Sequence, residues 1–304
     1  MSGTPDVVVV GSACRDLVED DPRGWRLGGG ASYAALALAR LGLTVGATVV
    51  ADDLAAGSIE IEMIRDAGVD VRIQPGSKGP VFINHETPTG RIQQVPQVSD
   101  PVDPAALPAA WREAGAWMFA PVAAEIPDVW AAVPPADAKV ALGWQGLLRV
   151  LVAGERVHVR SPFVSPVVWR ANLVGVGADD IAAATTPADL ATLLQPGAEM
   201  LFTDGVHGGD AYRMGEGGGI AAVRRWRSIP IREYVDPVGA GDSFLSGVFA
   251  AQVRPSLVAG WHGSDADLRL GAACGSLILE GPGLYGVPYL KDAIERMSGG
   301  ENPD

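Results

Sequence analysis

The sequence predicts an α/β protein in which a mostly parallel central sheet is flanked by helices. Two kinds of segment alternate along much of the chain: short apolar runs rich in valine, and Ala- and Leu-rich runs that end at a glycine. The first kind is typical of strands that are buried on both faces, and the second of helices with a glycine just past their C-terminus. Their alternation predicts the βαβ order of a doubly wound sheet.

This alternation begins at the N-terminus. Residues 7–10 are four valines and predict the first strand, and residues 31–41 predict the first helix. Residues 44–50 predict the next strand because they are rich in β-branched side chains, and residues 54–67 predict the next helix. A glycine directly follows each of these two predicted helices, as expected for their ends.

The alternation is interrupted after residue 70. Residues 71–73, 80–85 and 91–95 are short segments of mixed polarity, separated by glycine-containing turns. They predict small strands joined by hairpin turns. Such an insert could form a lid or a dimer interface, or be a solvated hairpin at one edge of the sheet, and the pattern leaves these alternatives open.

After residue 100 the alternation returns. A glycine-rich stretch at residues 215–219 predicts a loop tip, and Asp265 is a candidate N-cap for a late helix. The remaining predicted strands are residues 117–119, 139–142, 172–176, 200–203 and 231–235, and the late helices are residues 240–253 and 265–279.

Composition limits the function classes. The 304 residues carry 36 acidic and 23 basic side chains, a formal net charge of -13, which argues against a surface that binds nucleic acid. Two cysteines are too few for a disulfide framework, and the N-terminus has no basic region of a secretory signal. Residues 31–51 are apolar, but Arg40 would lie near the centre of a bilayer. We therefore expect a soluble, cytoplasmic protein that has no membrane or nucleic-acid partner.

Residues 235–244 carry the clearest chemical signal. A predicted strand ends at Val235, a Gly-Ala-Gly turn follows, and an apolar helix begins. Small residues at a helix start let the unpaired amides approach an anion, such as a phosphoryl group in transfer. Asp242, inside this turn, could take a proton from an acceptor hydroxyl. The alternative is an ordinary glycine-rich turn with a capping aspartate.

Three motifs together carry a family resemblance. Residues 236–244 read DPVGAGDSF, residues 28–42 begin with three glycines and end with Ala-Arg-Leu-Gly, and residues 203–208 read TDGVHG. These resemble the two signatures and the nucleotide loop of the ribokinase-like (phosphofructokinase-B) carbohydrate kinases. The resemblance implies a single ribokinase-like domain over residues 1–304, with a small β-sheet lid formed by about residues 12–27 and 71–98.

The resemblance also implies roles for individual residues. Asp242 is the expected catalytic base, and Asp16 the carboxylate that holds substrate hydroxyls, although a solvated residue after the first strand is the alternative for Asp16. The amides of Gly239, Ala240 and Gly241 are the expected anion hole. Gly28 and Gly29 are expected to let the backbone approach the substrate. The residues expected on the ATP side are Thr203, Gly205, Gly208 and Asp236.

The chain departs from the family pattern at informative places. Tyr33 stands where most sugar-binding members have asparagine, and the family's metal-positioning motif is altered, so that Asp179 or Asp180 would act on Mg²⁺ through water. The aromatic residue at position 33 and the segment that contains Gln145 and Arg149 resemble the inositol kinase branch. Gln145 and Arg149 are thus candidate substrate-binding residues, with a polar loop as the alternative.

These observations predict an ATP-dependent phosphotransferase that uses Mg²⁺ and acts on a hydroxyl of a small polyol or sugar, with an inositol-like cyclic polyol favoured. The alternatives are a nucleoside or aldose/ketose kinase of the same family, and a non-catalytic sensor that binds nucleotide or polyol. A homodimer formed through the lid hairpin is a further hypothesis.

Overall fold

Strand β1 (Val7–Ser12) lies inside a large sheet and is buried along its whole length. Val7 and Val9 belong to the hydrophobic cluster on one face, and Val8 and Val10 to the cluster on the other. Because successive side chains of a strand point to opposite faces, four valines in a row suit a strand that is covered on both.

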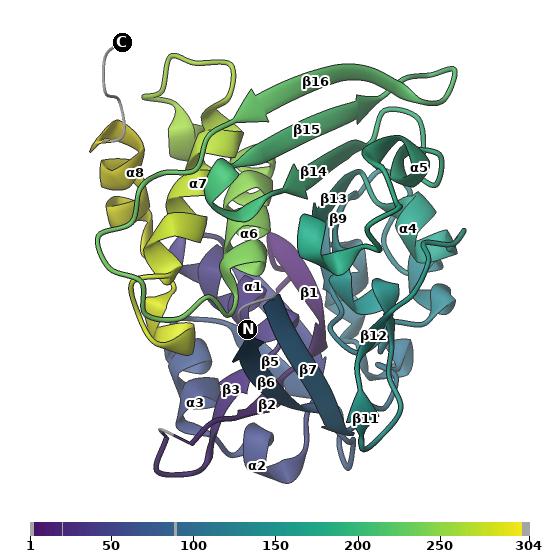
Figure 1. Ribbon diagram of the computed structural model, residues 1–304, viewed down its shortest axis with the longest axis vertical. Helices are drawn as coiled ribbons and strands as arrows, with labels where there is room; N and C mark the ends of the chain where they lie inside the picture. The colour runs from purple at the N-terminus through teal and green to yellow at the C-terminus, as the bar shows by residue number, and fades with distance from the viewer. Residues whose placement is uncertain (1–2, 20, 88–89, 300–304) are drawn as a thin grey trace.

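The computed structural model describes residues 3–19, 21–87 and 90–299 (Figure 1). Within these residues the central sheet has nine strands. The pairs β14–β15 and β15–β16 are antiparallel, and all other neighbours pair in parallel. The order across the sheet is β16 (Ile220–Trp226), β15 (Gly209–Met214), β14 (Glu199–Thr203), β13 (Leu173–Gly177), β9 (Lys139–Gly143), β8 (Ala116–Ala120), β1, β4 (Val45–Val50) and β5 (Asp70–Ile73).

A second, smaller sheet lies at one end of the central sheet, at the bottom of Figure 1. Its β2 and β6 pair in parallel, and its other neighbours are antiparallel. Its order is β11 (Glu155–Arg156), β7 (Gly90–Gln97), β6 (Val81–Thr87), β2 (Cys14–Leu17) and β3 (Trp25–Gly28). Strands β10 (Arg149–Val150) and β12 (His158–Val159) form a separate pair.

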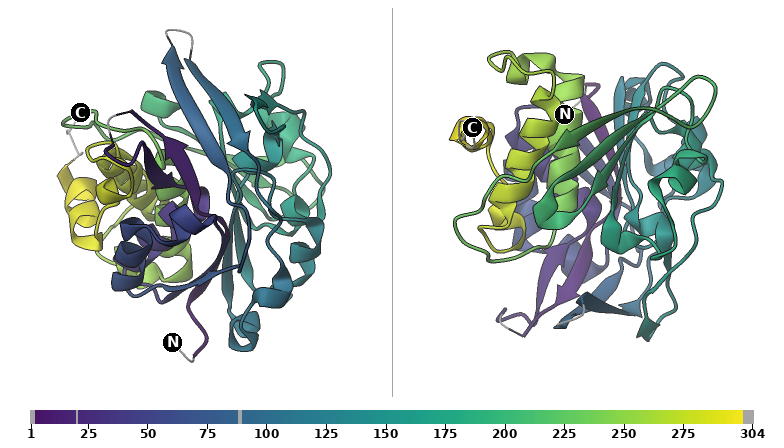
Figure 2. Two further views of the ribbon diagram at one scale, coloured as in Figure 1. Left: turned by 90° about the horizontal axis from the view of Figure 1, so that it is seen from below. Right: turned by 45° about the horizontal axis from the view of Figure 1, so that its top comes forward.

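Helices cover both faces of the central sheet, so that the molecule has three layers, as the two views of Figure 2 show. The α-helices are α1 (Gly30–Arg40), α2 (Asp53–Ala56), α3 (Ile59–Asp66), α4 (Pro166–Arg170), α5 (Pro187–Ala191), α6 (Ala240–Val253), α7 (Ala266–Ile278) and α8 (Leu290–Gly299). The 3-10 helices are η1 (Pro104–Ala106), η2 (Ala109–Glu113), η3 (Asp128–Ala132), η4 (Gln145–Leu148), η5 (Ala178–Asp180), η6 (Gly205–His207), η7 (Pro255–Val258) and η8 (Gly283–Gly286).

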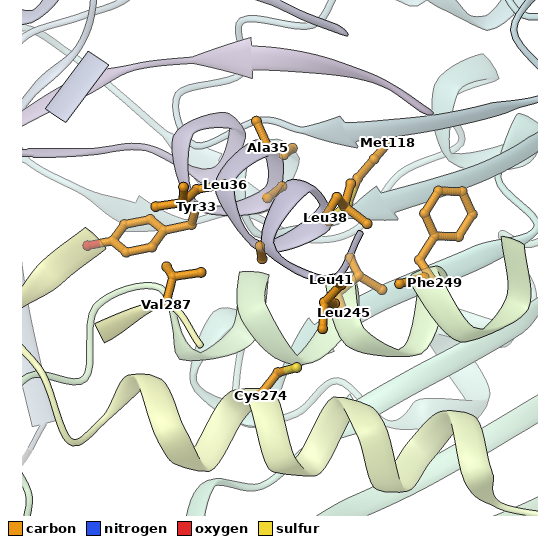
Figure 3. Close-up of a cluster of buried hydrophobic side chains, with 14 of the residues drawn as sticks. Tyr33, Ala35, Leu36, Leu38, Leu41, Met118, Leu245, Phe249, Cys274 and Val287 are labelled. Carbon is orange, nitrogen blue, oxygen red and sulfur yellow. The ribbon is translucent and has the colours of Figure 1, made fainter. Parts of the chain in front are cut away.

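Helices α1, α6 and α7 pack together on one face, where Leu38 and Leu41 lie near Leu245 and Phe249 (Figure 3). Glycines allow α6 and α7 to approach closely. A Cβ atom on Gly247 would lie 2.8 Å from the Cα atom of Gly271, and a Cβ atom on Gly271 would lie 2.8 Å from the carbonyl oxygen of Phe244. The helix that carries Asp242 is therefore fixed by tight packing along its length.

Several elements expected from the sequence are present, and the fold class is confirmed. Helix α6 has the expected bounds, and the glycine-rich stretch at residues 215–219 is the turn between β15 and β16. Asp265 lies at the N-cap of α7, where its side chain makes no capping hydrogen bond. None of the helices in the described ranges is long and apolar enough to cross a membrane.

Three expectations differ from the structure. Residues 231–235 are not a strand, because the amide of Val235 donates to the carbonyl oxygen of Leu279, at the end of α7, instead of to a neighbouring strand. Residues 54–67 form two helices, because Ser58 caps a new helix by accepting from the amide of Ile61. Residues 71–73 pair with β4 in the central sheet rather than with the insert. Residue 20 and residues 88–89 of the expected lid lie outside the described residues.

The close approach of α6 and α7 predicts the effect of Gly271→Ala. The added methyl group meets the backbone of α6, which cannot move away without disturbing the packed layer, so we expect the free energy of unfolding to fall by about 1–3 kcal/mol. Urea denaturation measures this change. The control is Gly115→Ala, since a Cβ atom at this exposed glycine meets nothing within 4 Å. Equal stability of the two variants would contradict the prediction.

Candidate active site

A cavity lies where the carboxyl ends of the parallel strands meet the smaller sheet. Strands β9, β13 and β14 contribute their last residues or the loops that follow them, the smaller sheet contributes one of its faces, and helices α1 and α6 contribute their N-terminal turns. Open α/β sheets bind ligands at this edge. The polar side chains that line the cavity are Asp16, Asn84, Gln93, Gln145, Arg149, Asp180, Thr203 and Asp242.

The turn before α6 opens its backbone amides toward the cavity. Gly239, at the N-cap, has φ +83°, and a Cβ atom there would collide with the ring of Tyr33, so that both the conformation and the space require glycine. The first intrahelical bond runs from the amide of Ser243 to the carbonyl of Gly239. The amides of Gly241 and Asp242 therefore have no acceptor within the helix and can receive an anion.

The amide of Ala240 has a different environment from its neighbours. It donates to the carbonyl oxygen of Pro237 over 3.3 Å, closing the turn. Of the three amides expected to form an anion hole, at Gly239, Ala240 and Gly241, that of Ala240 is therefore engaged within the turn, while the amide of Asp242 is open beside that of Gly241.

The carboxylate of Asp242 lines the cavity. Its Oδ1 is 3.1 Å from the place that a Cβ atom of Gly30 would occupy, so the glycine at the start of α1 makes room for it. Burial, and next the negative charge of Asp180, raise the pKa of Asp242 to about 7, while Arg149 acts in the opposite direction. Across the described ranges, no group donates a hydrogen bond to this carboxylate, which leaves it available to a ligand.

Asp180 is held by two loops. Its Oδ1 accepts from Nε2 of Gln145 at 2.6 Å and lies 4.0 Å from Arg149, and its Oδ2 accepts from the amide of Gly177 at 3.1 Å. The structure thus brings Gln145, Arg149 and Asp180 together at one wall of the cavity. Asp179 is exposed and does not line it.

Asp16 lines the cavity from β2, in the smaller sheet. Its side chain is buried, and a Cβ atom on Gly28 would collide with its Oδ2, so glycine at position 28 allows the carboxylate its place. Gly29 lines the cavity beside it with φ +98°. The structure therefore places Asp16 in the cavity and not in solvent.

Tyr33 lies beneath the turn that precedes α6. Its side chain is buried, with one edge at the cavity and its ring against Gly239, and burial, together with nearby carboxylates, raises the pKa of the phenol. An aromatic ring at this position supports the turn from below by direct contact.

The residues expected on the ATP side have different placements. Thr203 lines the cavity, whereas Gly205 and Gly208 lie in and just after η6 and do not line it. Asp236 accepts from the amides of Val238 and Gly283 and lies 3.6 Å from Arg26. Its carboxylate is therefore engaged in holding the turn.

Sequence reasoning missed two polar residues of the cavity. Asn84 and Gln93 reach it from β6 and β7, in the segment where the sequence predicts hairpin strands. The alternation of side chains along a strand could have indicated that only one face of the hairpin lines a site, but not which face.

Comparison with known proteins bears on these observations. Residues 176–289 match the sequence model of the pfkB family carbohydrate kinase, a range that includes the end of β13, Asp180 and the whole turn before α6. Over these residues the chain is similar to pfkB family carbohydrate kinases, and the structure has the ribokinase fold. The resemblance seen in the sequence is thereby confirmed. A comparison with curated protein sequences finds no match.

Solved structures agree with this fold. The chain is similar to a pyrophosphate-dependent kinase in the ribokinase family complexed with a pyrophosphate analogue and myo-inositol, with TM-score 0.72, 17% identity and coverage of 95% of this chain and 99% of the other. Ribokinase from Arabidopsis thaliana complexed with ribose and ATP is similar with TM-score 0.67 and 18% identity, and the match covers 97% of this chain and 99% of the other. Fructokinase from Xylella fastidiosa with bound ATP is similar with TM-score 0.69 and 17% identity, and the match covers 97% of this chain and 98% of the other.

The raised pKa of Asp242 predicts a pH-dependent difference in stability between the protein and its Asp242→Asn variant. The folded state keeps the proton up to about pH 7, whereas the pKa of a free aspartate side chain is 3.8. The stability that this proton contributes is therefore complete below pH 4 and is lost as the pH rises through 7. Asparagine does not titrate, so the variant loses no stability in this way. We expect the variant to gain about 2–3 kcal/mol relative to the parent between pH 5 and pH 8.

Urea denaturation at several pH values measures this difference. Asp66→Asn, at the exposed end of α3, is the control and should show no such trend. A difference that stays constant from pH 5 to pH 8 would show that Asp242 does not titrate near neutrality.

Proposed function

We propose that the protein transfers the γ-phosphoryl group of ATP to a hydroxyl of a small neutral polyol or sugar, with an inositol-like cyclic polyol as the favoured acceptor. The observation that carries the proposal is a carboxylate, Asp242, whose pKa lies at about 7 and which adjoins the open amides of α6 in one cavity. A group with this pKa is about half ionised at neutral pH and can accept a proton there.

The reaction divides between two parts of the α6 turn. Asp242 takes the proton of the acceptor hydroxyl as its oxygen bonds to the γ-phosphorus, and the bond from that phosphorus to the bridging oxygen breaks to release ADP. The amides of Gly241 and Asp242 stabilise the negative charge on the phosphoryl oxygens. Burial of the cavity strengthens these interactions, because little water competes with them.

Charge in the cavity supports a neutral acceptor. Its walls carry three carboxylates, Asp16, Asp180 and Asp242, against one cation among the described lining residues, Arg149. An acceptor with its own phosphate or carboxylate would meet this excess of negative charge, and the donor adds more. A polyol instead offers hydroxyls, which donate well to Asp16.

The choice of an inositol-like acceptor has two supports. Tyr33, Gln145 and Arg149 all line the cavity and are the positions that resemble the inositol kinase branch. A pyrophosphate-dependent kinase complexed with myo-inositol is among the similar structures. Nucleosides, aldoses and ketoses are the alternative acceptors, since nucleoside kinase, ribokinase and fructokinase structures have TM-scores of 0.67, 0.67 and 0.69.

The donor side has two candidates. ATP is favoured by the ATP complexes of similar ribokinase and fructokinase structures, and pyrophosphate is the second candidate because similar structures include pyrophosphate-dependent kinases. Magnesium fits the oxygen-rich wall at Asp180, because this carboxylate would hold the ion together with the donor phosphates. The bound ion would neutralise charge on the transferring group. Asp179 is exposed and is the less suitable of the two aspartates.

An acceptor panel tests this function. With magnesium and ATP, or magnesium and pyrophosphate, we expect turnover with one class among inositols, other polyols, aldoses, ketoses and nucleosides, and none with sugar phosphates or sugar acids, which the charge of the cavity repels. Release of ADP or of inorganic phosphate measures the reaction. Absence of turnover with every neutral acceptor, although ATP binds in calorimetry, would favour a non-catalytic sensor.

Asp242→Asn separates a kinase from a sensor. Asparagine keeps the shape but cannot accept the hydroxyl proton, so we expect kcat to fall by about 10²–10⁴-fold. Calorimetric titration with ATP should still show binding, because the amides of the α6 turn remain. Unchanged turnover in the variant would rule out Asp242 as the base. Asp66→Asn serves as the control with unaltered turnover.

A further inference from the structure

A buried carboxyl group that the proposed reaction does not use lies in the loop after β8. The side chain of Glu125 is 2% exposed and does not line the cavity. Its oxygens accept from Oγ of Ser12 at 2.7 Å, from the amide of Ala123 at 2.7 Å and from the amide of Val122 at 3.1 Å. Burial raises the pKa of this carboxyl, and the hydrogen bonds act in the opposite direction. In either protonation state the group keeps an acceptor oxygen for the two amides.

The loop that supplies these amides is strained and needs their support. Ala124 has φ 57°, and within the described ranges it is the one residue other than glycine with a positive φ. An alanine keeps such a conformation only where the surrounding contacts determine it. The side chain of Glu125 holds the loop from within, and its carbonyl oxygen accepts from the amide of Val102 at 2.8 Å. Glu125 therefore fixes the conformation of residues 121–125.

This loop supports the part of the chain that carries Gln145 and Arg149. A Cβ atom on Gly146 would collide with the backbone of Pro121 and lie 2.6 Å from the amide nitrogen of Val122, so η4 rests directly on the loop. Nη1 of Arg149, the residue that follows η4, donates to the carbonyl oxygen of Val122 at 3.4 Å. The loop thus contacts this segment at its beginning and just after its end.

We propose that Glu125 is a positioning residue for phosphoryl transfer: it holds the loop after β8, and this loop sets the position of Gln145 and Arg149. The inference rests on the proposed function of the same cavity. Gln145 donates to Asp180 at 2.6 Å, and Arg149 is the one cation among the described lining residues. A shift of η4 therefore changes both shape and charge beside Asp242. A misplacement of about 1 Å in a site can cost about 10²-fold in rate.

The experiment compares Glu125→Met with Ser12→Ala. Methionine is close to glutamate in length but has no oxygen for the amides of Val122 and Ala123. Ser12→Ala is the matched control, because it removes a hydrogen bond of the same buried carboxyl group and leaves both loop amides on it. For each protein, kcat and KM are measured for donor and acceptor, and urea denaturation measures stability.

We expect kcat/KM to fall about 10–100-fold in Glu125→Met, and less in Glu125→Gln, which keeps one acceptor oxygen. Ser12→Ala should lose stability and keep the parent kcat/KM. Parent activity in Glu125→Met, or an equal loss in Ser12→Ala, would overturn the proposal. If Glu125→Met does not fold, Glu125→Gln takes its place, and its loss must still exceed that of Ser12→Ala.

A second variant tests the route through the cavity wall. If Glu125 acts by placing Arg149, the two residues are not independent, and their effects on the transition state do not add. The combined loss of kcat/KM in Glu125→Met with Arg149→Met should therefore be smaller than the product of the two single losses. A combined loss equal to that product would overturn the proposal.

Hydrogen exchange separates failure of this inference from failure of the proposed function, because it needs no turnover. The amide of Gly177 donates to Oδ2 of Asp180, the carboxylate that Gln145 also contacts. Glu125→Met should speed exchange at Gly177 as well as at the loop amides, measured by NMR, and Ser12→Ala should leave Gly177 unchanged. Faster exchange in the loop alone would overturn the proposal in an active kinase. A response at Gly177 in a parent protein without turnover would overturn only the proposed function and support the positioning role.

Discussion

The left-handed turn at Gly239 is the constraint on which the candidate site depends. A residue with a side chain would need both an unfavourable conformation there and space that the ring of Tyr33 occupies. The turn is held from below by Tyr33 and from the side by Asp236, which binds the amides of Val238 and Gly283. Because of this support, α6 begins with open amides next to Asp242, and an anion and a base can act at the same place.

The packed helical layer also positions the residues that surround the α6 turn. Helix α1 begins at Gly30, which makes room for Asp242, and the same helix carries Tyr33 under the α6 turn. Contacts of α1 with α6, and of α6 with α7, are made by leucine, phenylalanine and glycine in one cluster (Figure 3). The polar site therefore lies at the end of a rigid apolar layer, which keeps its groups in position before a ligand binds.

The sequence predicted the fold class, the resemblance to carbohydrate kinases and the α6 motif because each rests on local signals, such as those carried by adjacent positions at residues 7–10 and 239–242. It did not predict elements that depend on distant partners. Residues 231–235 look like a strand, but the amide of Val235 donates to the carbonyl of Leu279 at the end of α7. Asn84 and Gln93 join Asp16 only through the register of three strands, and register is fixed by pairing and not by a motif.

The charge of the site indicates how an acidic protein can hold a phosphoryl group. Its three lysines, Lys78, Lys139 and Lys291, do not line the cavity, and Arg149 stands among three carboxylates. Positive potential there comes from the N-termini of α1 and α6, whose amides need no counter-charge and do not titrate. Such dipoles stabilise charge at short range only, so a phosphoryl group is favoured at the turn itself and not elsewhere in the cavity. Burial, and next the charge of Asp180, raise the pKa of Asp242, so that a carboxylate that would repel a charged acceptor also favours proton transfer.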